Sequence, residues 1–270
     1  MKRAMFYLSV AVVAFYCLGP FIWQIITSLK PPERLTSLPP LLPDAPTAVN
    51  YAAIFEDRTF MRIIANSAIV ASASTVLSLS LGAPAAFALA WLGVRRRGAI
   101  LAAVLSVSMF PPIATVSPLY LVIRELGMRD TLTALVIVYT TFALPLTIWV
   151  LTSFFREVPA EIMSAAKMDG CSDFQSFRKI ALPLSAPGVV ATAVLVFIFS
   201  WNEFLFALTF TSTPASRTIP VGIALFPGLH ETPWGEIAAA SVIVTVPLVV
   251  LVFVFQRRIV EGLTAGAIKS

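Results

Sequence analysis

The chain has 270 residues, of which 58% are hydrophobic and only 12% are charged. A soluble domain carries about 25% charged residues, so this composition nearly excludes a soluble enzyme or binding domain. The mean hydropathy of +0.89 favours a polytopic membrane protein. The formal charge is +5, from 19 Lys and Arg against 14 Asp and Glu. The two cysteines, Cys17 and Cys171, lie far apart in the sequence, which excludes a disulfide scaffold and a zinc ribbon.

Six stretches almost free of Asp, Glu, Lys and Arg predict membrane spans, because a helix needs about 20 apolar residues to cross the hydrocarbon core. The first stretch follows a basic start but is too long for a signal peptide and has no cleavage motif, so it is interpreted as a retained anchor. The fifth is interrupted only by Glu203. We expect an all-α membrane protein with one transmembrane domain over 1–270 and spans at about 5–28, 64–92, 99–123, 132–154, 187–210 and 237–256.

The distribution of basic residues predicts the orientation, since short cytoplasmic loops are rich in Lys and Arg. With the N-terminus in the cytoplasm, twelve Lys and Arg fall on the cytoplasmic side and seven on the other. The strongest contribution is the run Arg95–Arg97. Such a run also occurs in nucleic-acid patches, but here it lies between two spans and is interpreted as a topology anchor. Both termini are therefore expected in the cytoplasm.

Catalytic motifs are missing from the sequence. The single histidine, His230, is followed by Glu231 but not by the second histidine of a zinc protease motif. There is no GxSxG elbow and no Gly-Lys pair, so the chain has no Walker A loop to hold ATP. We expect no catalytic residue, no metal and no cofactor bound by this chain; any ATP that it uses must bind to another protein.

The long loop 156–186 predicts a helical hairpin on the cytoplasmic side. Pro159 and Glu161 suit the first turn of a helix, in which Ile162, Ala165 and Ala166 share one face. Gly170 is a typical C-terminal stop. Ser172 and Gln175 have the spacing of a capping box, and they start a second helix that ends at Leu182–Pro183.

Phe174 and Phe177 are expected to share one face of the second helix. Two interpretations remain open on physical grounds. The hairpin docks in a groove of a partner protein with its aromatic pair as the anchor, or it lies on the lipid surface as an amphipathic hairpin.

This loop resembles the EAA coupling loop of permease subunits in binding-protein-dependent ABC importers. The matching residues are Ala165, Ala166, Asp169, Gly170, Ile180, Leu182 and Pro183. Ser164 departs from the pattern, since it stands where the family has the Glu of EAA, and Cys171 stands where alanine is common.

The resemblance extends over nearly the whole chain. It includes Asn66–Ser67 at the second span, Ala86–Ala90, Pro118–Tyr120, Leu144–Pro145, Ser200–Phe204 and Arg217–Gly222. The C-terminal tail 257–270 resembles that of the maltose-type second permease. The chain as a whole resembles the permease of the actinobacterial trehalose importer, and this resemblance makes trehalose the leading candidate among di- and oligosaccharide substrates.

The resemblance implies a type I ABC importer permease fold and a defined set of partners. These are a second homologous permease, two ATPase subunits that hold ATP and Mg, an extracytoplasmic sugar-binding protein, the sugar and membrane lipid, with no nucleic acid, in a bacterial inner or plasma membrane. It also implies two groups of ATPase contacts. The loop supplies Glu161, Ala165, Ala166, Asp169, Gly170, Phe174, Phe177, Ile180, Leu182 and Pro183, and the tail supplies Gly262, Thr264, Gly266 and Lys269.

A candidate substrate pathway surrounds Glu203, the only strongly charged side chain well inside a predicted span. A charge at that depth is costly, so it should face the helix bundle or water rather than lipid. Trp201, Asn202 and Phe204 add stacking and hydrogen-bonding groups suited to a sugar. Alternatively, Glu203 pairs with the partner subunit or with a backbone group and touches no substrate.

Two competing functions remain. An ion channel or secondary transporter needs a row of ionisable groups in its spans, and Glu203 alone gives weak support. An intramembrane enzyme needs paired catalytic residues, which the sequence lacks. An ATPase partner is required only by the importer.

Overall fold

The computed structural model describes residues 2–31, 43, 45–226 and 232–265, and all the regular structure within these ranges is helical. Four helices are long: α1 (Lys2–Ser28), α3 (Arg58–Trp91), α6 (Leu132–Glu157) and α13 (Trp234–Ala265). The remaining elements are α2 (Val49–Glu56), α4 (Arg97–Ser108), α5 (Pro112–Glu125), α7 (Ala160–Met168), α8 (Asp173–Ser176), the π-helical turn η2 (Phe177–Ala181), α9 (Leu182–Leu184), α10 (Ala186–Asn202), α11 (Leu205–Phe210) and α12 (Ile219–Ala224).

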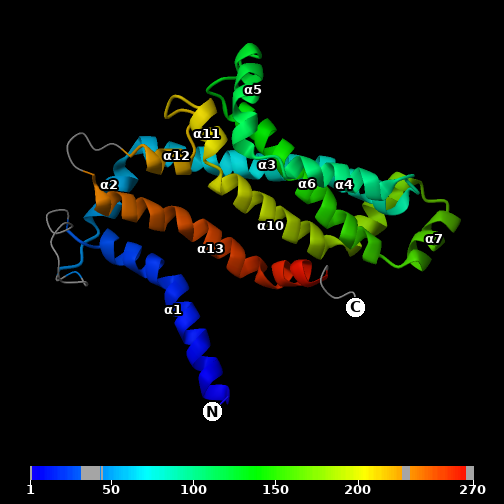
Figure 1. Cartoon of the computed structure of the whole chain (residues 1–270), viewed down its shortest axis with the longest axis horizontal. Helices are drawn as coiled ribbons and strands as arrows, with labels where there is room; N and C mark the ends of the chain where they lie inside the picture. Colours follow the sequence, from blue (N-terminus) through cyan, green and yellow to red (C-terminus); the bar gives the residue numbers. More distant parts are fainter. Residues whose placement is uncertain (1, 32–42, 44, 227–231, 266–270) are drawn as a thin grey trace.

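Four of the described helices are long and apolar enough to cross a membrane, and the number rises to six if two bent helix pairs each count as one span. The expected all-α, multi-pass architecture is therefore confirmed. In Figure 1, α3, α6, α10 and α13 run side by side, with α7 at one end of the bundle and α2 and α12 at the other.

The third predicted span, 99–123, is not one straight helix. It consists of α4 and α5, which meet at an angle of 86°. The bend follows from Pro111 and Pro112: the residue before a proline is disfavoured in α-helix, and a proline suits the first helical turn. Consequently α5 stands out from the bundle in Figure 1.

The fifth predicted span, 187–210, is also interrupted. Helix α10 ends at Asn202, Glu203 and Phe204 form a break, and α11 begins at Leu205. The second span begins earlier than expected, at Arg58, because Asp57 caps α3 by accepting a hydrogen bond from the Thr59 N–H at 2.8 Å.

The centre of the bundle is the pair formed by α3 and α6. Gly82 allows the two helices to approach closely, since a Cβ at this position would lie 2.5 Å from Cγ2 of Thr147. Small residues at such crossings are typical of membrane helices, where association depends on close packing. Near one end of the pair, the Trp91 indole N–H donates to the Phe155 carbonyl at 2.6 Å, which fixes α3 against α6.

Helix α1 lies at the outside of the bundle, and its apolar window has no buried residue among those described. It packs against α13. Its C-terminal end is held by Asn50 of α2, whose amide donates to the carbonyls of Ser28 at 2.8 Å and Lys30 at 3.0 Å. These bonds satisfy carbonyls that a helix end leaves free.

Candidate functional site

The first arm of the predicted hairpin is α7, which begins after Pro159 and carries Glu161 in its first turn. Gly170 ends it with φ +80°. The Gly170 N–H donates to the Lys167 carbonyl at 3.1 Å, and the Cys171 N–H donates to the Ala166 carbonyl at 2.9 Å. This pair of bonds is a Schellman motif, which requires a left-handed residue at the glycine position. The predicted stop at Gly170 is confirmed.

The second arm starts at the predicted capping box. The Ser172 N–H donates to the Gln175 side-chain oxygen at 2.9 Å, and the Gln175 N–H donates to Ser172 Oγ at 3.2 Å. Helix α8 then continues through η2 and α9 to Leu184, and the chain bends by 79° into α10. The two arms therefore form the expected hairpin, and Leu182 and Pro183 lie in its last turn, which ends at Leu184.

The residues of α7 that pack inward are not the three that were predicted to share one face. Met163 and Ala166 are buried, whereas Ile162 is 41% exposed and Ala165 is exposed as well. Of the predicted set Ile162, Ala165 and Ala166, only Ala166 faces inward. The sequence pattern could not distinguish these faces, because nearly every position in this short helix is apolar or small.

The two phenylalanines of the second arm have different environments. Phe177 is only 9% exposed and packs against Phe87 of α3, with ring centroids 5.3 Å apart, and Phe155 of α6, at 6.1 Å. Phe174 is 66% exposed. Phe177 thus joins the hairpin to its own bundle, and Phe174 is the ring that remains available to a partner.

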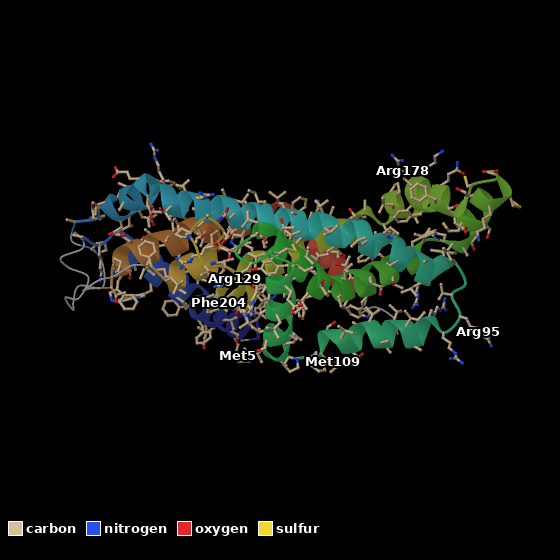
Figure 2. The ribbon with its side chains drawn as sticks, turned by 90° about the horizontal axis from the view of Figure 1, so that it is seen from above. Met5, Arg95, Met109, Arg129, Arg178 and Phe204 are labelled. Atoms are coloured by element: carbon tan, nitrogen blue, oxygen red, sulfur yellow. The ribbon has the colours of Figure 1, made fainter. Side chains whose placement is uncertain are left out.

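Most of the other residues predicted to contact an ATPase lie on the accessible surface of this hairpin. Exposed positions are Glu161, Asp169, Gly170 and Pro183, while Ile180 and Leu182 are half-buried. Met168, next to the turn, is exposed. In Figure 2, Arg95 and Arg178 lie at this same end of the molecule, so two of the basic positions expected on the cytoplasmic side lie near the hairpin.

Glu203 lies at the break between α10 and α11. Its two carboxylate oxygens accept hydrogen bonds from the N–H groups of Phe206 at 2.9 Å and Ala207 at 3.1 Å. These N–H groups belong to the first turn of α11 and have no partner within the helix. Of the alternatives for Glu203, pairing with backbone groups is the one seen in this structure.

The neighbours of Glu203 do not form one open surface. Trp201 is 4% exposed and stacks on Phe197, with ring centroids 5.5 Å apart. In this structure the Trp201 ring is therefore covered and has no free face for a sugar, so its expected stacking on the substrate stays a prediction. Asn202 is exposed and donates to the Ile198 carbonyl at 2.8 Å, and Phe204 is 40% exposed (Figure 2).

A polar junction that the sequence did not predict lies at the end of the bundle opposite the hairpin. Asp130, in the turn between α5 and α6, accepts bonds from the N–H groups of Ser212 and Thr213 at 2.7 and 3.0 Å. Partial burial alone would raise the pKa of Asp130, but these bonds and those from the Ser216 and Thr213 hydroxyls hold the pKa well below its ordinary value. The only signal in the sequence is an Asp in a polar turn, which is common.

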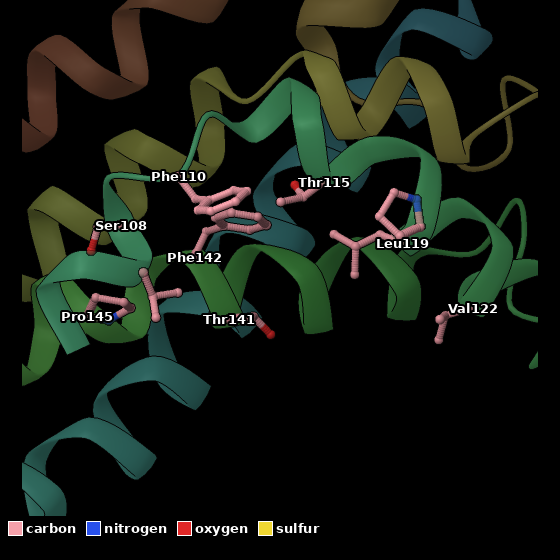
Figure 3. Close-up of a pocket in the computed structure, with 10 residues that line it drawn as sticks. Ser108, Phe110, Thr115, Leu119, Val122, Thr141, Phe142 and Pro145 are labelled. Atoms are coloured by element: carbon pink, nitrogen blue, oxygen red, sulfur yellow. The ribbon is translucent and has the colours of Figure 1, made fainter. Parts of the chain in front are cut away.

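An apolar cavity of about 410 Å³ lies where α4 bends into α5. Figure 3 shows Phe110, Leu119 and Phe142 among its lining side chains. The hydroxyls of Ser108, Thr115 and Thr141 are the only polar side-chain groups among its lining residues. A sugar site needs several hydrogen-bonding groups around an aromatic surface, so this cavity does not suit a sugar by itself.

Not every candidate residue can be placed. Gly262 and Thr264 belong to the last turns of α13, while Gly266, Lys269 and His230 lie outside the described residues. Among the described residues, no group of three or more His, Cys, Asp or Glu is arranged to hold a metal ion.

Comparison with known families identifies the chain. Residues 58–264 match the family model described as the inner membrane component of binding-protein-dependent transport systems. The chain belongs to this permease family. The match covers the bundle from α3 to the end of α13, including the hairpin, and places the permease in the membrane as a multi-pass protein.

Curated relatives extend over the full length of the permease. It is 44% identical to the trehalose transport system permease protein SugB of Mycobacterium tuberculosis over 261 residues, covering 96% of this chain and 95% of the relative. It is also 44% identical to the trehalose/maltose transport system permease protein MalG of Thermococcus litoralis over 274 residues, covering 100% and 98%. A sulfoquinovosyl glycerol permease, SmoH of Agrobacterium fabrum, is 40% identical over 98% of this chain and 93% of its own.

A solved structure confirms the fold. The permease superimposes on a chain of a bacterial ABC transporter that imports alginate with a TM-score of 0.82, covering 95% of each chain at 21% identity. The type I importer permease architecture expected from the sequence is therefore the fold of this protein.

Proposed function

We propose that this permease forms half of the translocation pathway of an ATP-driven sugar importer, and that it takes up trehalose or a closely related disaccharide. The relatives named above support the substrate class, since two permeases of trehalose systems are each 44% identical to it over at least 95% of their length. The partners in this proposal are a second permease, two ATPase subunits carrying ATP and Mg, and an extracytoplasmic sugar-binding protein.

The observation that carries the coupling proposal is the hairpin from α7 to α9. Its turn is closed by the Schellman motif and the capping box, its tip exposes Met168 and Phe174, and its base is fixed to α3 and α6 through Phe177. A rigid element with an exposed aromatic residue and a buried anchor suits a mechanical contact. In the proposed orientation, with both termini in the cytoplasm, this end of the bundle faces the ATPase.

Force would pass from the hairpin to the bundle through the aromatic contacts at its base. Phe177 packs against both Phe87 and Phe155, and the bond from the Trp91 indole to the Phe155 carbonyl joins α3 to α6. Because packed cores transmit strain rather than absorb it, a displacement of the hairpin by the ATPase moves α3 and α6 together. ATP binding then shifts the equilibrium between inward-facing and outward-facing states by the difference in binding energy between them.

The alternative of an ion channel or secondary transporter gains no support from Glu203, since both of its carboxylate oxygens accept backbone hydrogen bonds. Transport measured in a deletion strain tests the proposal. Removal of the gene should abolish uptake of radiolabelled trehalose, and the wild-type chain should restore it. An unimpaired deletion strain, or restored uptake that persists when cellular ATP is depleted, would contradict the proposal.

A further inference from the structure

The turn between α3 and α4 carries three consecutive positive charges. Arg95, Arg96 and Arg97 are all exposed. Helices α3 and α4 contain no Asp or Glu, so no carboxylate of either helix offsets these charges. Helix α6, which packs against α4, ends in Arg156 and Glu157, whose charges cancel. Three guanidinium groups are therefore presented together at one end of a pair of membrane-embedded helices.

The surface of α4 leads from this turn to the apolar cavity at the corner with α5. No residue of α4 is buried, and Ile100 and Val107 are among its exposed apolar side chains. In Figure 2, Arg95 and Met109 lie at opposite ends of this helix. Because each of its 12 residues rises by about 1.5 Å, the arginines and the cavity are about 18 Å apart along α4.

The cavity has the size of a ligand pocket and a lining suited to hydrocarbon. Its volume of about 410 Å³ lies within the range of roughly 300–1,000 Å³ that such pockets span. Two of its three hydroxyls, those of Thr115 and Thr141, already donate to carbonyls of their own helices, at 2.7 and 2.9 Å. The remaining lining, which includes Leu119 and Phe142, is apolar (Figure 3). An apolar chain therefore suits this cavity better than a polar ligand.

We propose that an anionic phospholipid binds along α4, with its phosphate at Arg95–Arg97 and the end of one acyl chain in the cavity. Half of a hydrocarbon core of about 30 Å is about 15 Å, so a chain anchored at the membrane surface ends near the depth at which α4 bends into α5. Basic clusters at the ends of membrane helices attract anionic headgroups, and guanidinium groups bind phosphate oxygens through paired hydrogen bonds. The two ends of the site are thus separated by about the length of the ligand. This site depends on neither the sugar nor an ATPase.

The test measures lipid contact with the cavity in the full-length chain, purified with the subunits that assemble with it and reconstituted in nanodiscs. The probe is a phosphatidylglycerol that carries a photoactivatable diazirine at the end of one acyl chain, and mass spectrometry locates the labelled peptides. At a low mole fraction of probe, labelling is proportional to affinity. Peptides that line the cavity should be labelled about 25-fold more by this probe than by a phosphatidylcholine with the same chains, because each basic residue near the surface contributes about fivefold in affinity for an anionic lipid.

One pair of variants tests the headgroup end of the site. Arg95→Gln combined with Arg97→Gln should reduce cavity labelling by phosphatidylglycerol about 25-fold, since two of the three charges are lost, and should leave labelling by phosphatidylcholine unchanged. Arg58→Gln combined with Arg62→Gln is the matched control. It removes two exposed arginines from the other end of α3 and should not change labelling of the cavity.

A second pair of variants tests the cavity. Thr141→Trp places a large side chain in the cavity and should abolish labelling of its lining, while all three arginines remain. Ser9→Trp is the matched control, because Ser9 is also an exposed hydroxyl residue that donates to a carbonyl of its own helix. It lies on α1, well apart from α4 and α5 in Figure 1, and it should leave cavity labelling unchanged.

Equal labelling of the cavity by the two probes, or unchanged labelling by phosphatidylglycerol when Arg95 and Arg97 are replaced, overturns the proposal, because any membrane lipid then fills the cavity equally well. Absence of cavity labelling by either probe also overturns it, and a crosslink from Thr141→Cys to another subunit would identify a protein as the occupant instead. If the arginine variant does not insert, the comparison of the two probes in the wild-type chain decides the question.

Discussion

Replacing Gly170 by alanine isolates the backbone requirement of the hairpin turn. Gly170 has φ +80°, and a Cβ added there would meet no described atom within 4 Å. The change therefore introduces no clash, and its cost is that of a left-handed L-residue, about 1–2 kcal/mol. That energy lowers the population of the closed turn relative to the open one by a factor of about 5 to 30.

Two measurements check this effect in the purified complex. The amides of Gly170 and Cys171 are bonded to Lys167 and Ala166 in the closed turn, so their hydrogen exchange should accelerate by about 5- to 30-fold. Sugar transported per ATP hydrolysed should fall, because a turn that opens transmits less of the ATPase motion.

Three further variants separate the causes. Gly170→Asn should recover most of the coupling, because asparagine tolerates the left-handed region. Gly98→Ala in α4 also adds a Cβ with no described atom within 4 Å, but without a positive φ, and it should be neutral. Gly170→Arg should insert into the membrane normally but uncouple uptake from hydrolysis. If Gly170→Ala leaves both exchange and coupling unchanged, the hairpin turn does not carry the function assigned to it.

Three other changes give predictions elsewhere in the bundle. Gly82→Ala places a Cβ 2.5 Å from Thr147, and the overpacking cost of about 1–3 kcal/mol should exceed the helix-propensity gain of about 1 kcal/mol. Thermal unfolding of the solubilised complex should show a lower Tm for Gly82→Ala than for wild type. Gly19→Ala should not lower the Tm, because no described atom lies within 4 Å of a Cβ at that position. If the Tm of Gly82→Ala equals that of wild type, the close crossing of α3 and α6 is disproved. Glu203→Gln replaces one of the two side-chain oxygens that accept hydrogen bonds from the backbone, so the Tm should fall by an amount equivalent to about 1–3 kcal/mol. The apparent KM for sugar should stay constant. An altered KM would instead place this side chain at the sugar. The pKa of Asp130 is depressed in the folded state. The difference in Tm between wild type and Asp130→Asn should therefore be constant above the unfolded-state pKa of about 3.9 and should shrink as the pH falls below it. A difference in Tm that grows as the pH falls would contradict this prediction.

Local rules in the sequence predicted the hairpin well. The stop at Gly170 and the capping box of Ser172 and Gln175 depend on a few neighbouring residues, so the residue types alone predict them. The sequence did not indicate that Ala166 and Phe177, both expected to contact an ATPase, are buried, because their burial depends on where α3 and α6 lie. Tertiary packing of this kind leaves no periodic signal in a helix of nine residues.

Hydropathy predicted where apolar chain crosses the membrane, but not where it bends. The breaks at Pro111 and Glu203 lie within long, mostly apolar stretches, and a window of hydrophobicity averages over them. Glu203 was identified as unusual, yet its role as a backbone acceptor became clear only from the start of α11. Asp130 was missed because its partners are more than 80 residues away in the sequence.

The contact between the hairpin and an ATPase is the central claim, and site-specific crosslinking from Phe174 tests it most directly. Phe174→Cys is introduced into a chain whose other cysteines, Cys17 and Cys171, are replaced by serine, and the assembled complex is treated with a short thiol–amine crosslinker. The account predicts a product that contains an ATPase subunit, and no such product from Thr213→Cys at the opposite end. An assembled complex in which Phe174→Cys forms no product with the ATPase would contradict it.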